Sequence, residues 1–303
     1  MLTKLKLIII GGDHRQVEIA KMIANKGGAV SMVGFEQLAD EQIDQMKIGF
    51  QEVDVRKVDA ILFPVGGVND TGKVESAYSD KSMLITKELF AKTREDCVIY
   101  TGIITPSLKQ LADVTNRKLV ALFERDDLAI YNSIPTAEGA LKLAIEHTDF
   151  TIHGSNVTVL GYGRVGKTIA RVFSAVGANV RVGVRKAADM ARVSEVGLKA
   201  FHLNNLEKEV SNVDICINTI PYLILSKPIL VNMCSHSLII DLASKPGGTD
   251  FQFAKEKGLK VLWALGLPGK VAPRTAGELI GHVLTDLLQE QLSALSEKEK
   301  DCF

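Results

Sequence analysis

Short runs of apolar residues alternate along the chain with longer segments in which apolar residues recur every three or four positions. The short runs predict buried strands, and the longer segments predict amphipathic helices. In the first half, strands are expected over residues 5–10, 29–33, 60–63, 83–85, 97–100 and 119–123. In the second half, they are expected over 157–160, 180–184, 200–202, 213–218, 238–241 and 260–263. Strands that are apolar throughout and separated by helices are typical of parallel sheets covered on both faces.

Two longer helices are expected to join the sheets. After Pro135 and Thr136, apolar residues keep a helical period, so a helix is predicted to begin at Pro135. The residues from Thr275 to Glu278 have the spacing of a capping box and predict a second helix over 276–295.

These elements predict an α/β protein with two doubly wound, Rossmann-like domains that contain parallel sheets and are joined by long helices. The first domain, a substrate or cap domain, is expected to cover residues 1–135 together with the returning helix. The second is expected to cover residues 150–275. The charged residues 296–303 are expected to fray.

A glycine-rich motif directly follows the first strand of the second domain. Its glycines are Gly161, Gly163 and Gly166, with Arg164 and Val165 at the expected helix start. Between a strand and a helix, this spacing is the fingerprint of a dinucleotide-binding loop. Gly161 would make the tight turn, Gly163 would let the pyrophosphate approach the backbone, and Gly166 would let the helix pack on the strand. The alternative is a tight turn that binds nothing.

The end of the next strand indicates which dinucleotide is bound. An NAD site would place an acidic residue there to hold the ribose hydroxyls, but the chain has Arg185 and Lys186 instead. Two cations at this position favour NADP, because they can hold the 2′-phosphate. The alternative is that both are simply solvated residues at a strand end.

Three later strand ends are expected at the same edge of the sheet, where ligands bind in open α/β folds. From these loops, coenzyme contacts are expected from Thr219, Pro221 and Leu242. Each loop is also rich in Gly or Pro and could be only a turn.

Composition narrows the class of protein further. The 303 residues include 36 basic and 36 acidic side chains, which argues against a nucleic-acid-binding protein. No apolar run is long enough to span a membrane. The spacing of metal ligands is absent from the cysteines, which are Cys97, Cys216, Cys234 and Cys302, so neither a metal site nor a disulfide framework is expected. A protein without disulfides is expected to be cytoplasmic.

Taken in order, several motifs resemble the family of the dipicolinate synthase A subunit, and the resemblance spans nearly the whole chain. They lie at residues 11–16, 122–127, 131–136, 147–154, 214–221, 241–250 and 266–269. The resemblance implies an oxidoreductase of endospore-forming bacteria that acts in the mother cell during sporulation. It implies NADP-dependent oxidation of dihydrodipicolinate to dipicolinate (pyridine-2,6-dicarboxylate). It also implies a partner, the flavoprotein-like B subunit of dipicolinate synthase.

A substrate with two carboxylates requires cationic or neutral hydrogen-bond donors. The residues expected to bind it are Arg15, Arg125, Asn132 and Arg274. The residues expected to take part in catalysis are Asp126, Ser133 and Lys245. For any one arginine, the alternative is a surface ion pair.

The residues do not decide which of four side chains accepts the proton, and the candidates are Asp126, Asp127, His153 and Asp241.

Two other functions stay open as well. One is an alanine-dehydrogenase-like NAD(P) oxidoreductase, because residues 267–275 also resemble a loop of that family, although residues 60–68 lack its lysine-containing motif. The other is a non-catalytic NADPH-binding subunit, and a homo-oligomer is compatible with each of these functions.

Overall fold

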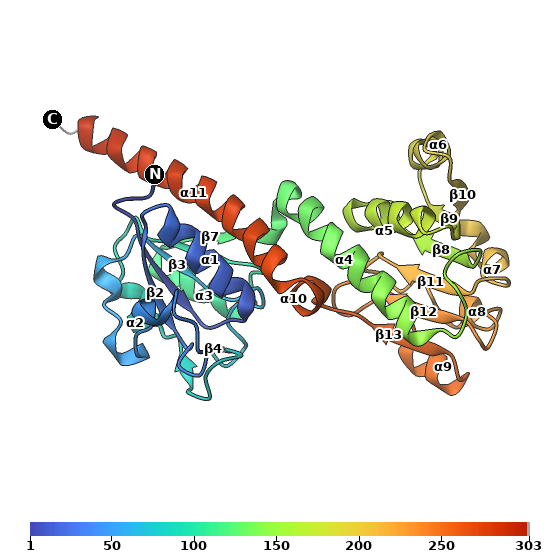
Figure 1. Ribbon diagram of the computed structural model, residues 1–303, viewed down its shortest axis with the longest axis horizontal. Helices are drawn as coiled ribbons and strands as arrows, with labels where there is room; N and C mark the ends of the chain where they lie inside the picture. Colours follow the sequence, from blue (N-terminus) through green and yellow to red (C-terminus); the bar gives the residue numbers. More distant parts are fainter. Residues whose placement is uncertain (302–303) are drawn as a thin grey trace. The chain divides into compact units, whose positions relative to one another are not determined.

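The computed structural model describes the backbone of residues 1–301 and the side chains of residues 1–295 (Figure 1). The chain forms two compact units. Unit 1 contains Met1–Leu128 and the segment that starts at Ala272, and unit 2 contains Ala129–Val271. Each unit is built around its own parallel sheet, which confirms the predicted fold class. The expected fraying of 296–303 and the residue Cys302 lie outside the fully described part of the chain.

The sheet of unit 1 has the strand order β2-β1-β3-β6-β7. The order reverses between β1 and β3, so the switch point at which such sheets bind ligands lies at the carboxyl ends of these two strands. The strands are β1 (Lys6–Ile10), β2 (Ala29–Val33), β3 (Ala60–Leu62), β6 (Val98–Thr101) and β7 (Lys118–Ala121). The helices are α1 (His14–Asn25), α2 (Lys87–Ala91), α3 (Pro106–Thr115) and α11 (Pro273–Asp301).

The sheet of unit 2 has the order β10-β9-β8-β11-β12-β13, which is the Rossmann order 3-2-1-4-5-6. Its switch point lies between β8 and β11. The strands are β8 (Asn156–Leu160), β9 (Asn179–Val184), β10 (Lys199–His202), β11 (Ile215–Asn218), β12 (Leu238–Asp241) and β13 (Lys260–Trp263). The helices are α4 (Asp126–His147), α5 (Arg164–Ala175), α6 (Ala187–Glu195), α7 (Leu206–Glu209), α8 (Lys227–Leu230), α9 (Phe251–Glu256) and α10 (Leu267–Val271).

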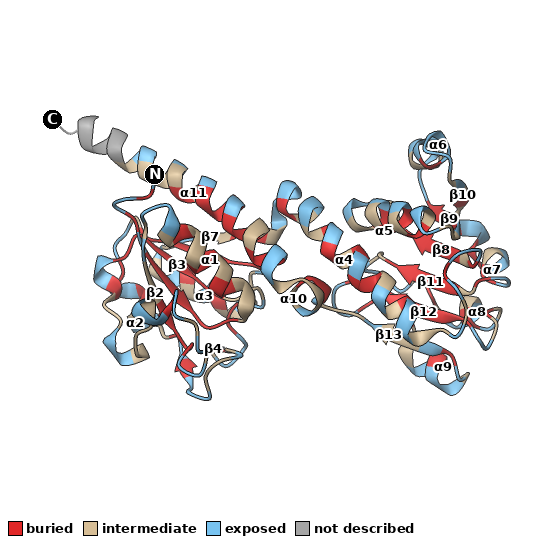
Figure 2. Ribbon diagram, in the orientation of Figure 1, coloured by how far each residue is buried: buried red, intermediate tan, exposed pale blue. Residues whose placement is uncertain are grey.

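Apolar side chains cover both faces of each sheet, so the central strands are buried, whereas edge strands such as β13 are partly exposed (Figure 2). Along β1, Leu7 and Ile9 face a core shared with α1 and α11, whereas Ile8 and Ile10 face a second core on the other side of the sheet. Burial on both faces explains why the strands are continuous apolar runs rather than alternating ones.

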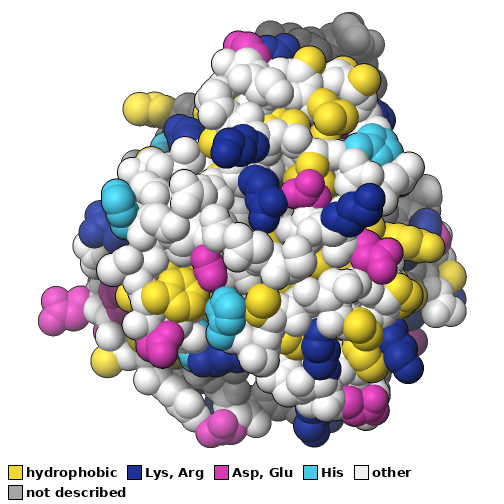
Figure 3. All heavy atoms as spheres, turned by 90° about the vertical axis from the view of Figure 1, so that its right-hand side faces the viewer, with side chains coloured by type: hydrophobic (Ala, Val, Ile, Leu, Met, Phe, Trp, Pro, Cys, Tyr) yellow, Lys and Arg dark blue, Asp and Glu magenta, His cyan; other side chains and the backbone are white. Residues whose placement is uncertain are grey.

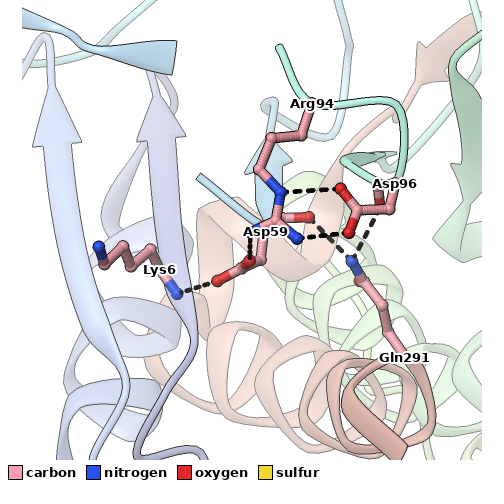
Figure 4. Close-up of polar contacts among 5 residues, drawn as sticks. All are labelled: Lys6, Asp59, Arg94, Asp96 and Gln291. Atoms are coloured by element: carbon pink, nitrogen blue, oxygen red, sulfur yellow. Dashed lines mark hydrogen bonds and ion pairs between the residues drawn. The ribbon is translucent and has the colours of Figure 1, made fainter. Parts of the chain in front are cut away.

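The amino edge of the unit 1 sheet is held by a buried carboxylate (Figure 4). Asp59 accepts hydrogen bonds from the backbone N–H of Lys6 at 2.8 Å and from Nη1 of Arg94 at 2.9 Å. Arg94 also pairs with Asp96. Nε2 of Gln291 donates to the carbonyls of Asp59 and Asp96, which fastens α11 to this edge.

Unit 2 repeats this arrangement. Asp214 accepts from the backbone N–H of Asn156 at 2.7 Å, and Nε2 of His236 lies 3.2 Å from its second oxygen. In both units, an aspartate before the strand that follows the switch point therefore ties that strand to the first strand.

Three predicted details of the elements were wrong. Residues 83–85 do not join the parallel sheet, because β5 (Met83–Leu84) pairs in antiparallel orientation with β4 (Lys73–Val74). Helix α4 begins at Asp126 and contains Pro135, since its apolar face is buried in the core and packing outweighs the local break. Helix α11 begins at Pro273, which is suited to a first helical position, so Thr275 lies within the helix and does not cap it.

Candidate functional site

Two of the three glycines in the loop between β8 and α5 are required by close contacts within the chain, and the third borders open space. Gly161 has a φ of +95°, and a Cβ there would lie 2.6 Å from Oγ1 of Thr219. A Cβ on Gly166 would lie 2.2 Å from the carbonyl oxygen of Gly161. In contrast, a Cβ on Gly163 would meet no atom within 4 Å. Gly161 and Gly166 thus allow the tight turn and close helix packing, while Gly163 leaves open space beside the backbone.

The start of α5 offers backbone donors at this open space. Gly163 is the N-cap in an extended conformation, and no described side chain caps the helix. Arg164 and Val165 form its first turn, whose N–H groups and positive partial charge suit a phosphate. The residues present therefore fit the pyrophosphate of a dinucleotide.

A buried aspartate organises the neighbouring loops at the carboxyl edge of the sheet. Asp241 is fully buried and accepts four hydrogen bonds, from Nδ2 of Asn218 at 3.0 Å, the N–H of Ala243 at 3.0 Å, the N–H of Gly248 at 2.9 Å and Oγ1 of Thr249 at 2.6 Å. Its oxygens are saturated with donors, which is the environment of a structural carboxylate rather than of an accessible base.

Asn218 connects the hydrogen bonds around Asp241, which we call the Asp241 frame, to the loop after β11. Its Oδ1 accepts from the N–H of Ile220 at 3.0 Å, and its Nδ2 also donates to the carbonyl of Ile220 at 3.1 Å. A Cβ on Gly248 would lie 2.2 Å from Nδ2 of Asn218, so only glycine fits there. Asn218 was not among the predicted site residues, although a polar residue at the end of an otherwise apolar strand was the available signal.

The three predicted coenzyme contacts lie along the rim that this frame supports. Thr219 bonds to the carbonyl of Leu160 through its N–H at 3.0 Å and through Oγ1 at 2.8 Å, which places it beside the glycine turn. Pro221 is exposed, and Leu242 is half-buried after β12. All three lie at the carboxyl ends of β11 and β12.

The cations predicted to select the coenzyme lie directly after β9. Arg185 and Lys186 are both exposed, and neither has an ion-pair partner among the described residues. Lys186 is the N-cap of α6. Both cations are therefore available to an anionic ligand at the same edge as the glycine loop.

Unit 1 has a cavity of about 440 Å³ at its own switch point, which we call the switch-point pocket. Arg15 lines it from the start of α1, Gly66 and Gly67 line it from the loop after β3, and Lys73 and Glu75 line it from β4 and the residues after it. The pocket contains charges of both signs.

Arg15 is oriented in this pocket by Asp13. Its Nε lies 2.9 Å and its Nη2 2.6 Å from the two carboxylate oxygens of Asp13, and Nη1 has no partner among the described residues. Burial raises the pKa of Asp13, but the hydrogen bonds and charge of Arg15 outweigh it and hold that pKa below its ordinary value. The pair leaves one edge of the guanidinium for a ligand.

The other predicted substrate arginines do not line this pocket. Arg125 pairs with Asp127 at 2.7 Å in an exposed position after β7. Arg274 is 78% exposed and pairs with Glu278 at 3.0 Å on the first turn of α11. Of the predicted cations, the structure brings only Arg15 to the switch point of unit 1.

The remaining predicted residues occupy different environments. Ser133 is buried, and its hydroxyl lies 2.6 Å from the carbonyl of Ile130 and 2.6 Å from Oγ1 of Thr168. Asn132 is half-buried, and its carbonyl accepts from Thr136. Lys245 is exposed in the loop after β12, and Asp126 is exposed on the first turn of α4.

Three further residues, His153, Cys97 and Cys216, lie away from the carboxyl edges. His153 lies before β8, at the amino edge of the unit 2 sheet. Burial raises the pKa of the Cys97 thiol and of the Cys216 thiol to about 12, so neither is a thiolate at neutral pH.

The described residues contain no cluster of three or more His, Cys, Asp or Glu side chains that could hold a metal ion. Within the same part of the chain, no helix is long and apolar enough to cross a membrane. On the face drawn in Figure 3, basic side chains lie among acidic ones.

A Rossmann sheet with an open glycine loop at its switch point defines a dinucleotide-binding protein of the dehydrogenase type. Residues 144–300 match the family model described as alanine dehydrogenase/PNT, C-terminal domain. Residues 6–123 match the family model for the N-terminal domain of the dipicolinate synthase A subunit.

The chain belongs to the family of the dipicolinate synthase A subunit, as its motifs indicated. It is 48% identical to the A subunit of dipicolinate synthase from Bacillus subtilis (strain 168) over 96% of this chain and 98% of that protein. The crystal structure of the dipicolinate synthase A subunit from Bacillus halodurans is 50% identical and has a TM-score of 0.92, covering 95% of this chain and 99% of that chain.

An L-alanine dehydrogenase shares the fold. That structure has a TM-score of 0.63 and covers 97% of this chain and 92% of its own, but it is only 13% identical. The likeness therefore supports the dehydrogenase-type architecture and says nothing about the substrate.

Proposed function

We propose that this chain oxidises dihydrodipicolinate to dipicolinate with NADP⁺ as the hydride acceptor. The observation that carries the proposal is the open glycine loop at the switch point of unit 2, in a chain that is 48% identical to a dipicolinate synthase A subunit. We further propose that it works in the cytoplasm of the mother cell during sporulation, with the flavoprotein-like B subunit of the synthase for its partner.

The coenzyme is proposed to bind along the carboxyl edge of the unit 2 sheet. The turn from Gly161 to Gly166 and the first N–H groups of α5 would hold the pyrophosphate. Arg185 and Lys186 would hold the 2′-phosphate, since they are exposed and without ion-pair partners among the described residues. Thr219, Pro221 and Leu242 would line the nicotinamide half.

The substrate is proposed to bind in the switch-point pocket of unit 1. The free edge of the Arg15 guanidinium would take one carboxylate, and Lys73 offers a second positive charge in the same pocket. We place Arg125, Asn132 and Arg274 outside this first contact, because none of them lines the pocket.

The reaction requires little covalent chemistry from the protein. The dihydropyridine ring loses a hydride from one carbon and a proton from the neighbouring position, and the products are the aromatic ring, NADPH and one proton. When bound, the coenzyme supplies the hydride acceptor. The chain has to orient the ring and accept the proton. Asp126 and Lys245 do not line the pocket either, so we place them, like Arg125, outside the first contact with the ring. Ser133, whose hydroxyl bonds within unit 2, is proposed to support α4 against α5 instead.

A simple assay tests the proposal. The purified chain alone, with dihydrodipicolinate and NADP⁺, should form NADPH and dipicolinate in equal amounts, and alanine should not replace the substrate. If product forms only when the B subunit is present, the claim that this chain catalyses the reaction alone is wrong. If alanine supports NADP⁺ reduction, the substrate assignment is wrong.

A further inference from the structure

The loop that carries Arg185 is held by a histidine on the neighbouring strand. Nε2 of His202 lies 3.0 Å from the carbonyl oxygen of Arg185, and Nδ1 of His202 lies 3.2 Å from the backbone nitrogen of Asn204. We infer that His202 is a positioning residue for the 2′-phosphate of NADP, acting through the backbone of Arg185. The inference rests on the proposed NADP-dependent function.

The two contacts define the form of the imidazole. The N–H of Asn204 is a donor, so Nδ1 must accept. The carbonyl of Arg185 is an acceptor, so Nε2 must carry the proton. Only the neutral Nε2–H tautomer satisfies both contacts at once, and it links the loops after β9 and β10 without adding a charge.

The backbone ladder alone cannot hold Arg185. Pairing between the two strands ends at Val184 and His202, one residue before Arg185. Just inside this end the strands are tightly packed, because a Cβ on Gly183 would lie 2.6 Å from the ring of Phe201. The side chain of His202 therefore supplies the next cross-strand bond where the backbone pairing stops.

Fixing this carbonyl fixes the direction in which the Arg185 side chain leaves the strand. Lys186 follows as the N-cap of α6, so the same contact also sets where the second cation and the helix begin. A pre-oriented cation loses less freedom when it binds a phosphate. Loss of the contact should weaken NADPH binding and leave NADH binding, which has no 2′-phosphate, nearly unchanged.

The test uses the full chain with His202→Leu, which keeps the bulk of the side chain and removes both contacts. Calorimetric titration should show a Kd for NADPH that rises about three- to tenfold, the size expected for one lost hydrogen bond. The Kd for NADH should change less than twofold. His202→Gln, whose amide can donate to the same carbonyl, should recover most of the NADPH affinity.

His236→Leu is the matched control, because His236 contacts Asp214 at the amino edge of the same sheet and should affect neither coenzyme. An unchanged NADPH affinity in His202→Leu, or an equal loss for both coenzymes, would overturn the inference alone. A parent protein that binds NADH as tightly as NADPH would overturn the NADP assignment, and this inference with it.

Discussion

Asp241 shows how a single buried residue shapes the coenzyme rim. Its carboxylate accepts from two backbone N–H groups and two side chains. In Asp241→Asn, an N–H₂ group would face at least one of these donors. We expect the free energy of unfolding, measured in urea, to fall by about 2–3 kcal/mol. Thr249→Val removes only one donor and should cost about 1 kcal/mol. Equal stability of Asp241→Asn and the parent would show that the network does not support the fold.

Arg185 should determine the choice of coenzyme. Removing one charge-assisted contact in Arg185→Ala should weaken NADPH binding about ten- to a hundredfold and leave NADH binding unchanged. The matched control is Arg192→Ala on α6, because Arg192 pairs with Glu195 in solvent at 2.6 Å. If Arg185→Ala binds NADPH normally, the 2′-phosphate lies elsewhere.

Arg15 should act on the substrate and not on the coenzyme. Arg15→Ala should raise the KM for the dicarboxylate about tenfold or more while the Kd of NADPH stays the same. Arg56 is a suitable control, because it pairs with Asp54 two residues away in the same unit but does not line the pocket. If Arg15→Ala has the same KM and kcat as the parent, Arg15 does not bind the substrate, and its pairing with Asp13 is only structural.

The sequence predicted the glycine turn but not the environments of the polar side chains around it. The glycine spacing predicted the turn, because Gly161 and Gly166 are required by contacts within the turn and the residues next to it. The saturation of Asp241 and the burial of Ser133 against Thr168 depend on neighbours that folding brings together. A strand-end aspartate looks the same in sequence whether it is free or fully hydrogen-bonded.

At the scale of elements, helices α1 and α11 cross at two glycines. A Cβ on Gly277 would lie 2.6 Å from the carbonyl oxygen of Arg15, whereas one on Gly281 would lie 2.9 Å from the flexible thioether of Met22. Alanine normally stabilises a helix by about 0.5–1 kcal/mol over glycine. In Gly277→Ala the clash with backbone should exceed that gain and lower the Tm by several degrees.

Gly281→Ala is the matched control for this crossing. The end of the Met22 side chain can move, so this variant should keep or slightly raise the Tm. If Gly277→Ala is as stable as Gly281→Ala, the helices are not packed as closely as described.

Most strands were predictable because they are continuous apolar runs, whereas the errors arose where tertiary context outweighs local signals. Residues 83–85 have the composition of a strand, but pairing with β4 places them outside the sheet. Pro135 has the form of a helix start, yet the apolar face of α4, which includes Ala140 and Ala144, is buried in the core of unit 2. Partners distant in sequence decided both cases.

In the molecule as a whole, both units contain a parallel sheet with helices on its faces, and the two sheets differ in strand order. Each unit has a parallel sheet, an aspartate that ties two strands together at its amino edge and candidate site residues at its carboxyl edge. The glycine fingerprint identified the coenzyme unit from sequence. No comparable motif marks the switch-point pocket, because its lining comes from several separate loops.

Deuterium labelling shows whether this chain itself transfers a hydride from the substrate to NADP⁺. Dihydrodipicolinate carrying deuterium at the ring carbon that loses the hydride is incubated with the chain alone and NADP⁺. The deuterium should appear on the nicotinamide ring of NADPH, in equal amount to the dipicolinate formed. Dipicolinate formed without labelled NADPH, or with the deuterium released to water, would contradict direct hydride transfer by this chain.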